Sequence, residues 1–141
     1  MITAAWIMTA AIWASPGAPA ADAGATSAPP PARRVIVAAC TAETPQAGAV
    51  FSGTVLQVID GRTLCVAQGP APRDWVLVRL ADVQDRRARG ALMAASFARK
   101  IDCTAGRRQG GGVLATCAAD GVTLGELTRT DAVKAAGRAW R

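Results

Sequence analysis

Arginine is the residue type in this chain best suited to chemistry with anions. The 141 residues include 16 Lys and Arg against 10 Asp and Glu, which gives a net charge of +6. All the cations are Arg except Lys100 and Lys134, and a planar guanidinium donates paired hydrogen bonds to phosphate. The chain contains no His, so the commonest general base and metal ligand is missing. This balance favours nucleic acid or another polyanion as a partner, although a basic surface that is merely solvated would have the same composition.

Four cysteines are expected to form two disulfides. They include no Cys-x-x-Cys pair, so neither a structural zinc site nor a thioredoxin-type redox site is expected. Cys103 and Cys117 are equidistant from Gly110, as two facing residues of an antiparallel hairpin would be, and such residues lie close enough for a bridge. Cys40 would then pair with Cys65 by elimination. Disulfides are typical of an oxidising compartment, and buried free thiols are the alternative.

The N-terminal region has the composition of a signal peptide followed by a linker. Residues 1–20 contain an uncharged apolar stretch that is too short to span a bilayer and is followed by an Ala-x-Ala motif. Residues 21–48 are assigned to a Pro- and Ala-rich linker and an N-terminal segment, and residues 49–141 to one domain. We therefore expect a secreted or periplasmic monomer with no transmembrane segment after cleavage. A disordered Ala-rich tail or a misassigned start codon is the alternative for residues 1–20.

Short strands and two short helices must position these residues. Asp60-Gly61 lies between two apolar segments and is expected to supply the positive φ of a tight hairpin. Alternation in the third strand places Arg79 on the face opposite its apolar residues. A stripe of Leu92, Met93 and Phe97 on the first helix is expected to face the core. The expected strands are residues 53–58, 63–67, 75–80, 101–104 and 113–118, and the expected helices are residues 87–99 and a second one from the Thr123 capping box to residue 132 or beyond.

Residues 54–64, with the sequence TVLQVIDGRTL, resemble the opening hairpin of the staphylococcal nuclease (thermonuclease) family, whose motif there is Val-x-Asp-Gly-Asp-Thr. The resemblance continues in register through Val78-Arg79-Leu80-Ala81, Val113-Leu114-Ala115 and Asp120-Gly121. It implies a mainly β (α+β) fold, which is a small OB-type five-stranded barrel with two short helices.

Most of the catalytic residues implied by this resemblance are replaced. Members of the family hydrolyse phosphodiesters with a calcium ion held by two Asp, a Glu that orients water, and two Arg that clamp the phosphate. The replacements are Arg62 for one metal-binding Asp, Gln84 for the other, Arg87 for the Glu and Gly112 for one Arg. Arg79, at the retained phosphate-clamp position, and the turn residue Asp60 remain.

We therefore expect a thermonuclease-like domain that has lost phosphodiesterase activity and binds a polyanion or a protein. The residues expected to bind are Arg62, Arg79, Arg87, Arg107 and Arg108. Few aromatic residues are present for stacking on bases, which argues against strong single-strand binding. The alternative is a divergent nuclease of DNA or RNA that uses Arg79 with Asp60, Asp82 or Asp85 as substitute catalytic residues. No cofactor is expected, except calcium if that alternative holds.

Overall fold

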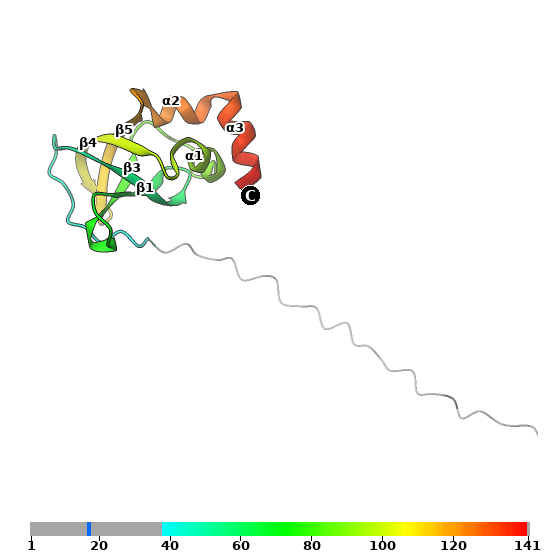
Figure 1. The fold of residues 1–141 in the computed structure, drawn as a ribbon, viewed down its shortest axis with the longest axis horizontal. Helices are drawn as coiled ribbons and strands as arrows, with labels where there is room; N and C mark the ends of the chain where they lie inside the picture. The colour runs from blue at the N-terminus through cyan, green and yellow to red at the C-terminus, as the bar shows by residue number, and fades with distance from the viewer. Residues whose placement is uncertain (1–16, 18–37, 141) are drawn as a thin grey trace, which may run out of the picture. The chain divides into compact units, whose positions relative to one another are not determined.

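β-Strands dominate the computed structural model, which describes Gly17 and residues 38–140 (Figure 1). Alternating buried and exposed residues, as in β3 with Val76, Val78 and Leu80 turned inward, are typical of strands with one face on a core. The predicted signal peptide and most of the linker lie outside the described residues. The strands are β1 (Val50–Asp60), β2 (Thr63–Ala67), β3 (Trp75–Leu80), β4 (Lys100–Gln109), β5 (Gly112–Ala119) and β6 (Val122–Thr123).

Five of these strands close into a barrel. The first half of β1 pairs with β4 and its second half with β2, so this long strand belongs to both sides of the sheet. β2 pairs with β3, β4 pairs with β5, and a parallel ladder between β3 and β5 completes the circle. β6 is an extra strand on β5. The expected closed five-stranded barrel is therefore present, and it is consistent with an OB-type fold.

The interior of the barrel is aliphatic. Leu64, Leu80, Leu92, Ile101 and Leu124 are the largest of its fully buried side chains, and Val residues from every barrel strand except β4 fill the space between them. Leu92 comes from α1 (Arg89–Ser96) and Leu124 from α2 (Leu124–Arg129), so these two helices contribute directly to the core.

The prediction of two helices was wrong. Beyond α1 and α2, a third helix α3 (Asp131–Gly137) follows, and short 3-10 turns occur at η1 (Pro72–Asp74) and η2 (Arg138–Trp140). The Thr123 cap is confirmed, since its hydroxyl accepts a hydrogen bond from Glu126 N. The helix that it opens ends at Arg129 because Thr130 is extended, with φ −69° and ψ 143°, and its hydroxyl caps α3 by accepting from Val133 N. α1, α2 and α3 lie together at one side of the barrel (Figure 1).

Helix α1 is shorter than the predicted 87–99. It ends at Ser96, after which Phe97 becomes extended and forms a bridge with Val55 of β1. The predicted apolar stripe is therefore correct for the buried Leu92 and the partly buried Met93, but wrong for Phe97. Its side chain is 40% exposed and contacts Trp140, with ring centroids 6.2 Å apart.

The strands β1, β4 and β5 extend further than predicted. The Arg- and Gly-rich residues 106–109, which were expected to form a loop, remain in the ladder between β4 and β5 with a register shift between Ala105 and Arg108. The turn therefore narrows to Gly110-Gly111, which have φ values of 56° and 78°.

The predicted role of Gly61 was wrong. Positive φ occurs at Gly110, Gly111 and other turn residues, and Gly61 is not among them. Gly61 is instead buried under the loop that follows β3: a Cβ there would lie 2.7 Å from Arg86 C and 2.8 Å from Ala88 N. Gly61 N donates to Arg86 O at 2.7 Å. The glycine is required by a close approach of two backbones.

Both predicted disulfides are present. Cys103 on β4 faces Cys117 on β5 with a Cα–Cα distance of 4.1 Å, and Cys40 is bridged to Cys65 on β2 with a Cα–Cα distance of 5.6 Å. The two bridges fit the oxidising compartment expected from the sequence. Within the described part of the chain, no helix is long and apolar enough to cross a membrane.

Residues 39–49 form an N-terminal belt around the barrel. Ala39 N donates to the side chain of Gln57 on β1, Cys40 is bridged to β2, and Ala42 N donates to Trp75 O at the start of β3. The belt then reaches β4, where Gly48 N donates to Ala105 O at 2.7 Å. It thus covers the outer surface of β2 and β3 near Cys65, which is fully buried.

Candidate anion-binding site

Arg79 lies near the end of β3 on the outer face of the barrel. It pairs with Thr63 of β2 on one side and with Leu114 of β5 on the other. Its guanidinium group lies against the β4–β5 turn, where a Cβ on Gly110 would be 3.0 Å from Nη2. The absence of a side chain at Gly110 therefore makes room for Arg79. The sequence prediction that Arg79 points away from the apolar face is confirmed.

Arg62 lies beside Arg79 along the backbone. Its carbonyl accepts a hydrogen bond from Leu80 N at 2.8 Å, which joins the β1–β2 turn to the end of β3. Its own N–H donates to Asp60 Oδ1 at 2.8 Å, so the turn is held by the side chain of Asp60. The two arginines thus belong to neighbouring positions at one end of the barrel.

The Nε atoms of Arg62 and Arg79 are both buried and have no hydrogen-bond partner within residues 38–140. A buried donor that lacks an acceptor costs about 1–3 kcal/mol. Both groups are half-buried, so part of each guanidinium remains open to solvent while its inner edge is desolvated. An oxyanion placed over the outer edge would interact with a more weakly screened charge than it would on a freely exposed side chain.

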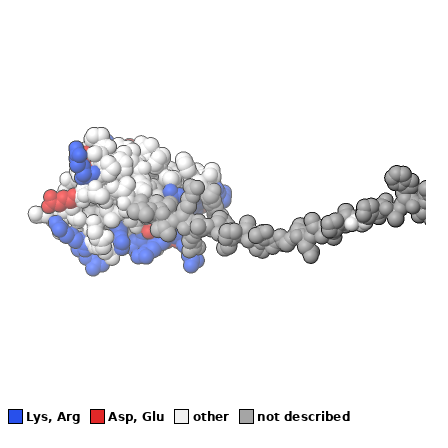
Figure 2. Space-filling view, turned by 90° about the horizontal axis from the view of Figure 1, so that it is seen from below, with Lys and Arg blue, Asp and Glu red and all other residues white. Residues whose placement is uncertain are grey.

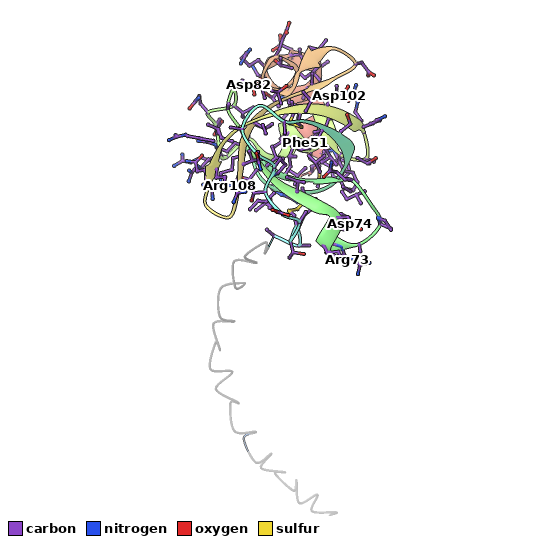
Figure 3. All side chains as sticks on the ribbon, turned by 90° about the vertical axis from the view of Figure 1, so that its left-hand side faces the viewer. Phe51, Arg73, Asp74, Asp82, Asp102 and Arg108 are labelled. Carbon is purple, nitrogen blue, oxygen red and sulfur yellow. A yellow bond between two sulfur atoms is a disulfide. The ribbon has the colours of Figure 1, made fainter. Side chains whose placement is uncertain are left out.

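Arg107 and Arg108 lie just before the β4–β5 turn and are exposed. Arg108 pairs with Val113 and donates through Nη2 to Thr44 O of the belt at 3.2 Å. Figure 3 shows Arg108 at the outer edge of this hairpin, away from Arg73. Arg79 lies between the two turns, because it contacts Gly110 on one side and its strand ends beside Arg62 on the other.

Arg87 lies in the exposed loop that follows β3. This loop packs on the β1–β2 turn through the hydrogen bond between Gly61 N and Arg86 O. Arg87 is therefore next in the chain to Arg86, which bonds to the turn that contains Arg62. Arg87 also lines a cavity next to α3. Four of the five predicted arginines come from three connections, namely the β1–β2 turn, the loop after β3 and the β4–β5 hairpin, and the fifth, Arg79, lies on β3.

The arginines of this site are not neutralised by carboxylates. Among residues 38–140 the single ion pair joins Arg99 to Asp120 at 2.6 Å, outside the site. Figure 2 shows Lys and Arg side chains along one side of the domain with few Asp or Glu side chains among them. Uncompensated positive charge of this kind attracts polyanions over several ångströms.

The three predicted carboxylates each hold backbone rather than one another. Asp60 accepts from Arg62 N, Asp85 accepts from Arg87 N at 2.8 Å, and Asp82 Oδ2 accepts from Gly125 N at 3.0 Å at the start of α2. In the described part of the chain, no three His, Cys, Asp or Glu residues are grouped so that they could hold a metal ion. Asp60, Asp82 and Asp85 therefore do not converge on a common centre.

Two of the replaced positions are unsuited to the roles that the resemblance implies. Gly112 is buried, and a Cβ there would lie 2.8 Å from Leu77 Cγ and closer still to the Leu77 carbonyl, so an arginine would not fit without a backbone shift. Gln84 is exposed and makes only a long contact of 3.5 Å with Ala81 O. Position 112 therefore has no room for the arginine that would clamp a phosphate, and the neutral amide of Gln84 lacks the negative charge of the metal-binding Asp that it replaces.

Sequence reasoning missed the helix-capping role of Asp82 and the path of the belt. The carboxylate of Asp82 caps a helix 43 residues further along the chain, and no local pattern signals such a contact. The belt could have been anticipated in part, because a Cys40–Cys65 bridge requires the N-terminal segment to cross β2.

Comparison of the chain with protein-family models, with curated proteins and with solved structures gave no match. The thermonuclease resemblance therefore stays a prediction from the motifs quoted above. The agreement with an OB-type fold rests on the barrel topology alone.

Proposed function

We propose that this domain is a secreted, thermonuclease-like module that binds polyanions without cleaving them. The observation that carries the proposal is the pair of arginines at one end of the barrel, Arg62 and Arg79, which lack carboxylate partners within residues 38–140. In OB barrels, strands 2 and 3 with the loops between strands 1–2 and 4–5 form the usual face for oligonucleotides and oligosaccharides. Arg62, Arg79, Arg107 and Arg108 occupy or adjoin these elements.

Phosphate contacts rather than base contacts account for this binding. The belt covers the part of β2 and β3 around Cys65, so only the end of the face near Thr63 and Arg79 is left for a ligand. No Phe, Tyr or Trp occurs between Arg62 and Leu80 other than Trp75, whose Nε1 donates to Gly69 O at 3.0 Å. A stacking platform for bases is therefore lacking on this strand pair.

The absence of cleavage follows from the roles of the carboxylates. Metal-assisted hydrolysis needs convergent oxygen ligands to hold the cation. Asp60, Asp82 and Asp85 instead each accept a hydrogen bond from a backbone N–H group and do not converge on one point, and Arg62, beside Asp60, adds positive charge that would repel a metal ion. Two disulfides support the secreted part of the proposal.

Binding of a fluorescein-labelled single-stranded DNA to the oxidised protein, followed by anisotropy at several salt concentrations, tests the proposal. We expect that Arg62→Gln and Arg79→Gln each weaken binding about tenfold and lower the salt slope by about 0.7, because each removes one phosphate contact. Arg73→Gln is the matched control, since Arg73 is exposed and lies just before the start of β3, whereas Arg79 lies near the end of that strand. An equal loss in Arg73→Gln would show that binding is spread over the whole basic surface, against the proposal.

Cleavage of the same labelled DNA and of an RNA of equal length, with calcium or with EDTA, tests the lack of catalysis. We expect no cleavage above that of a heat-inactivated sample in either condition. Calcium-dependent cleavage that disappears in Asp82→Ala or Asp85→Ala would instead establish the divergent nuclease.

A further inference from the structure

A groove lies between the loop after β3 and the helices α1, α2 and α3. It consists of two adjoining cavities of about 450 Å³ each, which share the lining residues Asp85, Ala88, Ala91 and Lys134. Each volume falls within the range of roughly 300–1,000 Å³ that is usual for small-molecule sites. Neither cavity is lined by Arg62, Arg79, Arg107 or Arg108, so Arg87 is the one arginine of the candidate anion-binding site that also lines the groove.

The first cavity is surrounded by positive charge. Arg87, Lys134 and Arg138 line it, and the side chains of all three lack a hydrogen bond or ion pair with the rest of residues 38–140. The one carboxylate in its wall, Asp85, already accepts a hydrogen bond from Arg87 N. Three cations around one cavity, two of them guanidinium forks, match the charge and the several acceptor oxygens of a phosphate dianion.

The floor of the first cavity is made of backbone. A Cβ on Gly137 would lie 2.6 Å from Ala91 N, and a Cβ on Gly90 would lie 3.1 Å from Gly137 C, so α1 and α3 touch through their main chains. Because Gly90, Ala91 and Gly137 carry at most a methyl group, nothing in the floor fills the space between the three cationic side chains.

The second cavity is less polar and contains an unused acceptor. Val83, Ala88 and Ala91 give it an apolar wall. Asp82 also lines it, and Asp82 Oδ1 is buried without a hydrogen-bond partner in the described residues, while Oδ2 holds Gly125 N. A buried carboxylate oxygen without a donor is costly. Because Oδ1 has almost no accessible surface, a ligand hydroxyl or amino group in this cavity would reach it after a small rotation of the Asp82 side chain.

We propose that the groove binds a small phosphate monoester. The phosphate lies in the first cavity between Arg87, Lys134 and Arg138, and the organic part lies in the second, where its hydroxyl or amino group donates to Asp82 Oδ1. The two cavities share four lining residues, Lys134 among them, so a single short ligand can occupy them together. The phosphate supplies the charge and the organic part supplies the donor.

Isothermal titration of the full oxidised chain with glycerol 3-phosphate, inorganic phosphate alone and glycerol tests this proposal. We expect saturable binding with a stoichiometry of one for glycerol 3-phosphate, weaker binding of inorganic phosphate, and none of glycerol. Lys134→Gln and Arg138→Gln should each weaken binding of glycerol 3-phosphate about tenfold, which is the loss expected for one hydrogen bond to a charged group.

Two control variants make the test specific. Arg73→Gln removes an exposed cation outside the groove, and Arg79→Gln removes one from the polyanion-binding face, so both should bind glycerol 3-phosphate like the unmodified chain. The proposal is overturned if glycerol 3-phosphate does not bind, or if Arg73→Gln weakens binding as much as Lys134→Gln. Equal affinity for inorganic phosphate and glycerol 3-phosphate would overturn the role assigned to Asp82 and the second cavity.

Discussion

Single residues in this domain serve purposes that their type alone does not reveal. Asp60, Asp82 and Asp85 have the chemistry of metal ligands, yet each carboxylate is bonded to a backbone N–H group. Gly61 belongs to an Asp-Gly pair typical of tight turns, yet it is required by the loop packed above it. Arg79, in contrast, lies on the face that strand alternation predicts. Alternation along a strand therefore predicts which face a side chain occupies, whereas residue type does not predict which group of another element the side chain contacts.

Gly61→Ala should destabilise the domain by about 3 kcal/mol, because its methyl group would meet the backbone of residues 85–88 and force the loop outward. The comparison is Gly111→Ala, where φ is 78° but no atom lies within 4 Å of the added Cβ, and where a cost of about 1 kcal/mol is expected. Urea denaturation of the oxidised proteins measures both. A loss at Gly61 no greater than that at Gly111 would contradict the packing argument.

Asp82→Ala should lower the free energy of unfolding by about 1–2 kcal/mol, because Gly125 N at the start of α2 loses its acceptor. The effect should be independent of calcium, since Asp82 is not part of a metal-binding group within residues 38–140. Thermal unfolding with calcium and with EDTA checks this. A calcium-dependent rise in the melting temperature of the unmodified protein, lost in Asp82→Ala, would be the opposite result.

At the scale of elements, periodicity located the strands well and their ends poorly. The apolar alternation of residues 75–80 and 63–67 predicted β3 and β2 with their exact bounds. The predicted β4 ended too early because Gly106, Arg107 and Arg108 have the composition of a loop. In the structure these residues stay in the sheet, since β4 continues to pair with β5 beyond the Cys103–Cys117 bridge. The candidate site was predicted as a set of arginines, but the belt beside it could not be, because its course depends on contacts with β1, β3 and β4.

Thr130 lies between α2 and α3 and caps the start of α3. Thr130→Ala removes the acceptor for Val133 N at the start of α3, and we expect a loss of about 1 kcal/mol in the free energy of unfolding. Thr130→Ser retains the hydroxyl and should behave like the unmodified protein in urea denaturation. If serine and alanine are equally destabilising, the hydroxyl is not what caps α3.

The whole molecule is a small barrel reinforced by covalent links. A domain of about a hundred residues buries a modest core, and here the two disulfides add to it. The Cys103–Cys117 bridge joins strands that already pair, while the Cys40–Cys65 bridge fixes the belt to β2. The second bridge therefore also determines how much of the outer surface of β2 and β3 a ligand can reach.

Replacing Cys40 and Cys65 together by Ala should cost about 3.5 kcal/mol, the chain-entropy value for a closed loop of 25 residues. Hydrogen exchange should become faster at Thr41 N and Ala42 N, which bond to Pro72 O and Trp75 O only while the belt is in place. Unchanged exchange at these two amides would mean that hydrogen bonds alone hold the belt.

The belt also has a mechanical consequence. Tension applied to the chain before Cys40 is carried through the sulfur–sulfur bond into β2, which is paired on both sides by β1 and β3. The force then does not act on the N-terminal end of β1, so the hydrogen bonds between β1 and β4 are not broken one after another from that end. A pull from that end therefore acts on the hydrogen bonds on both sides of β2 together.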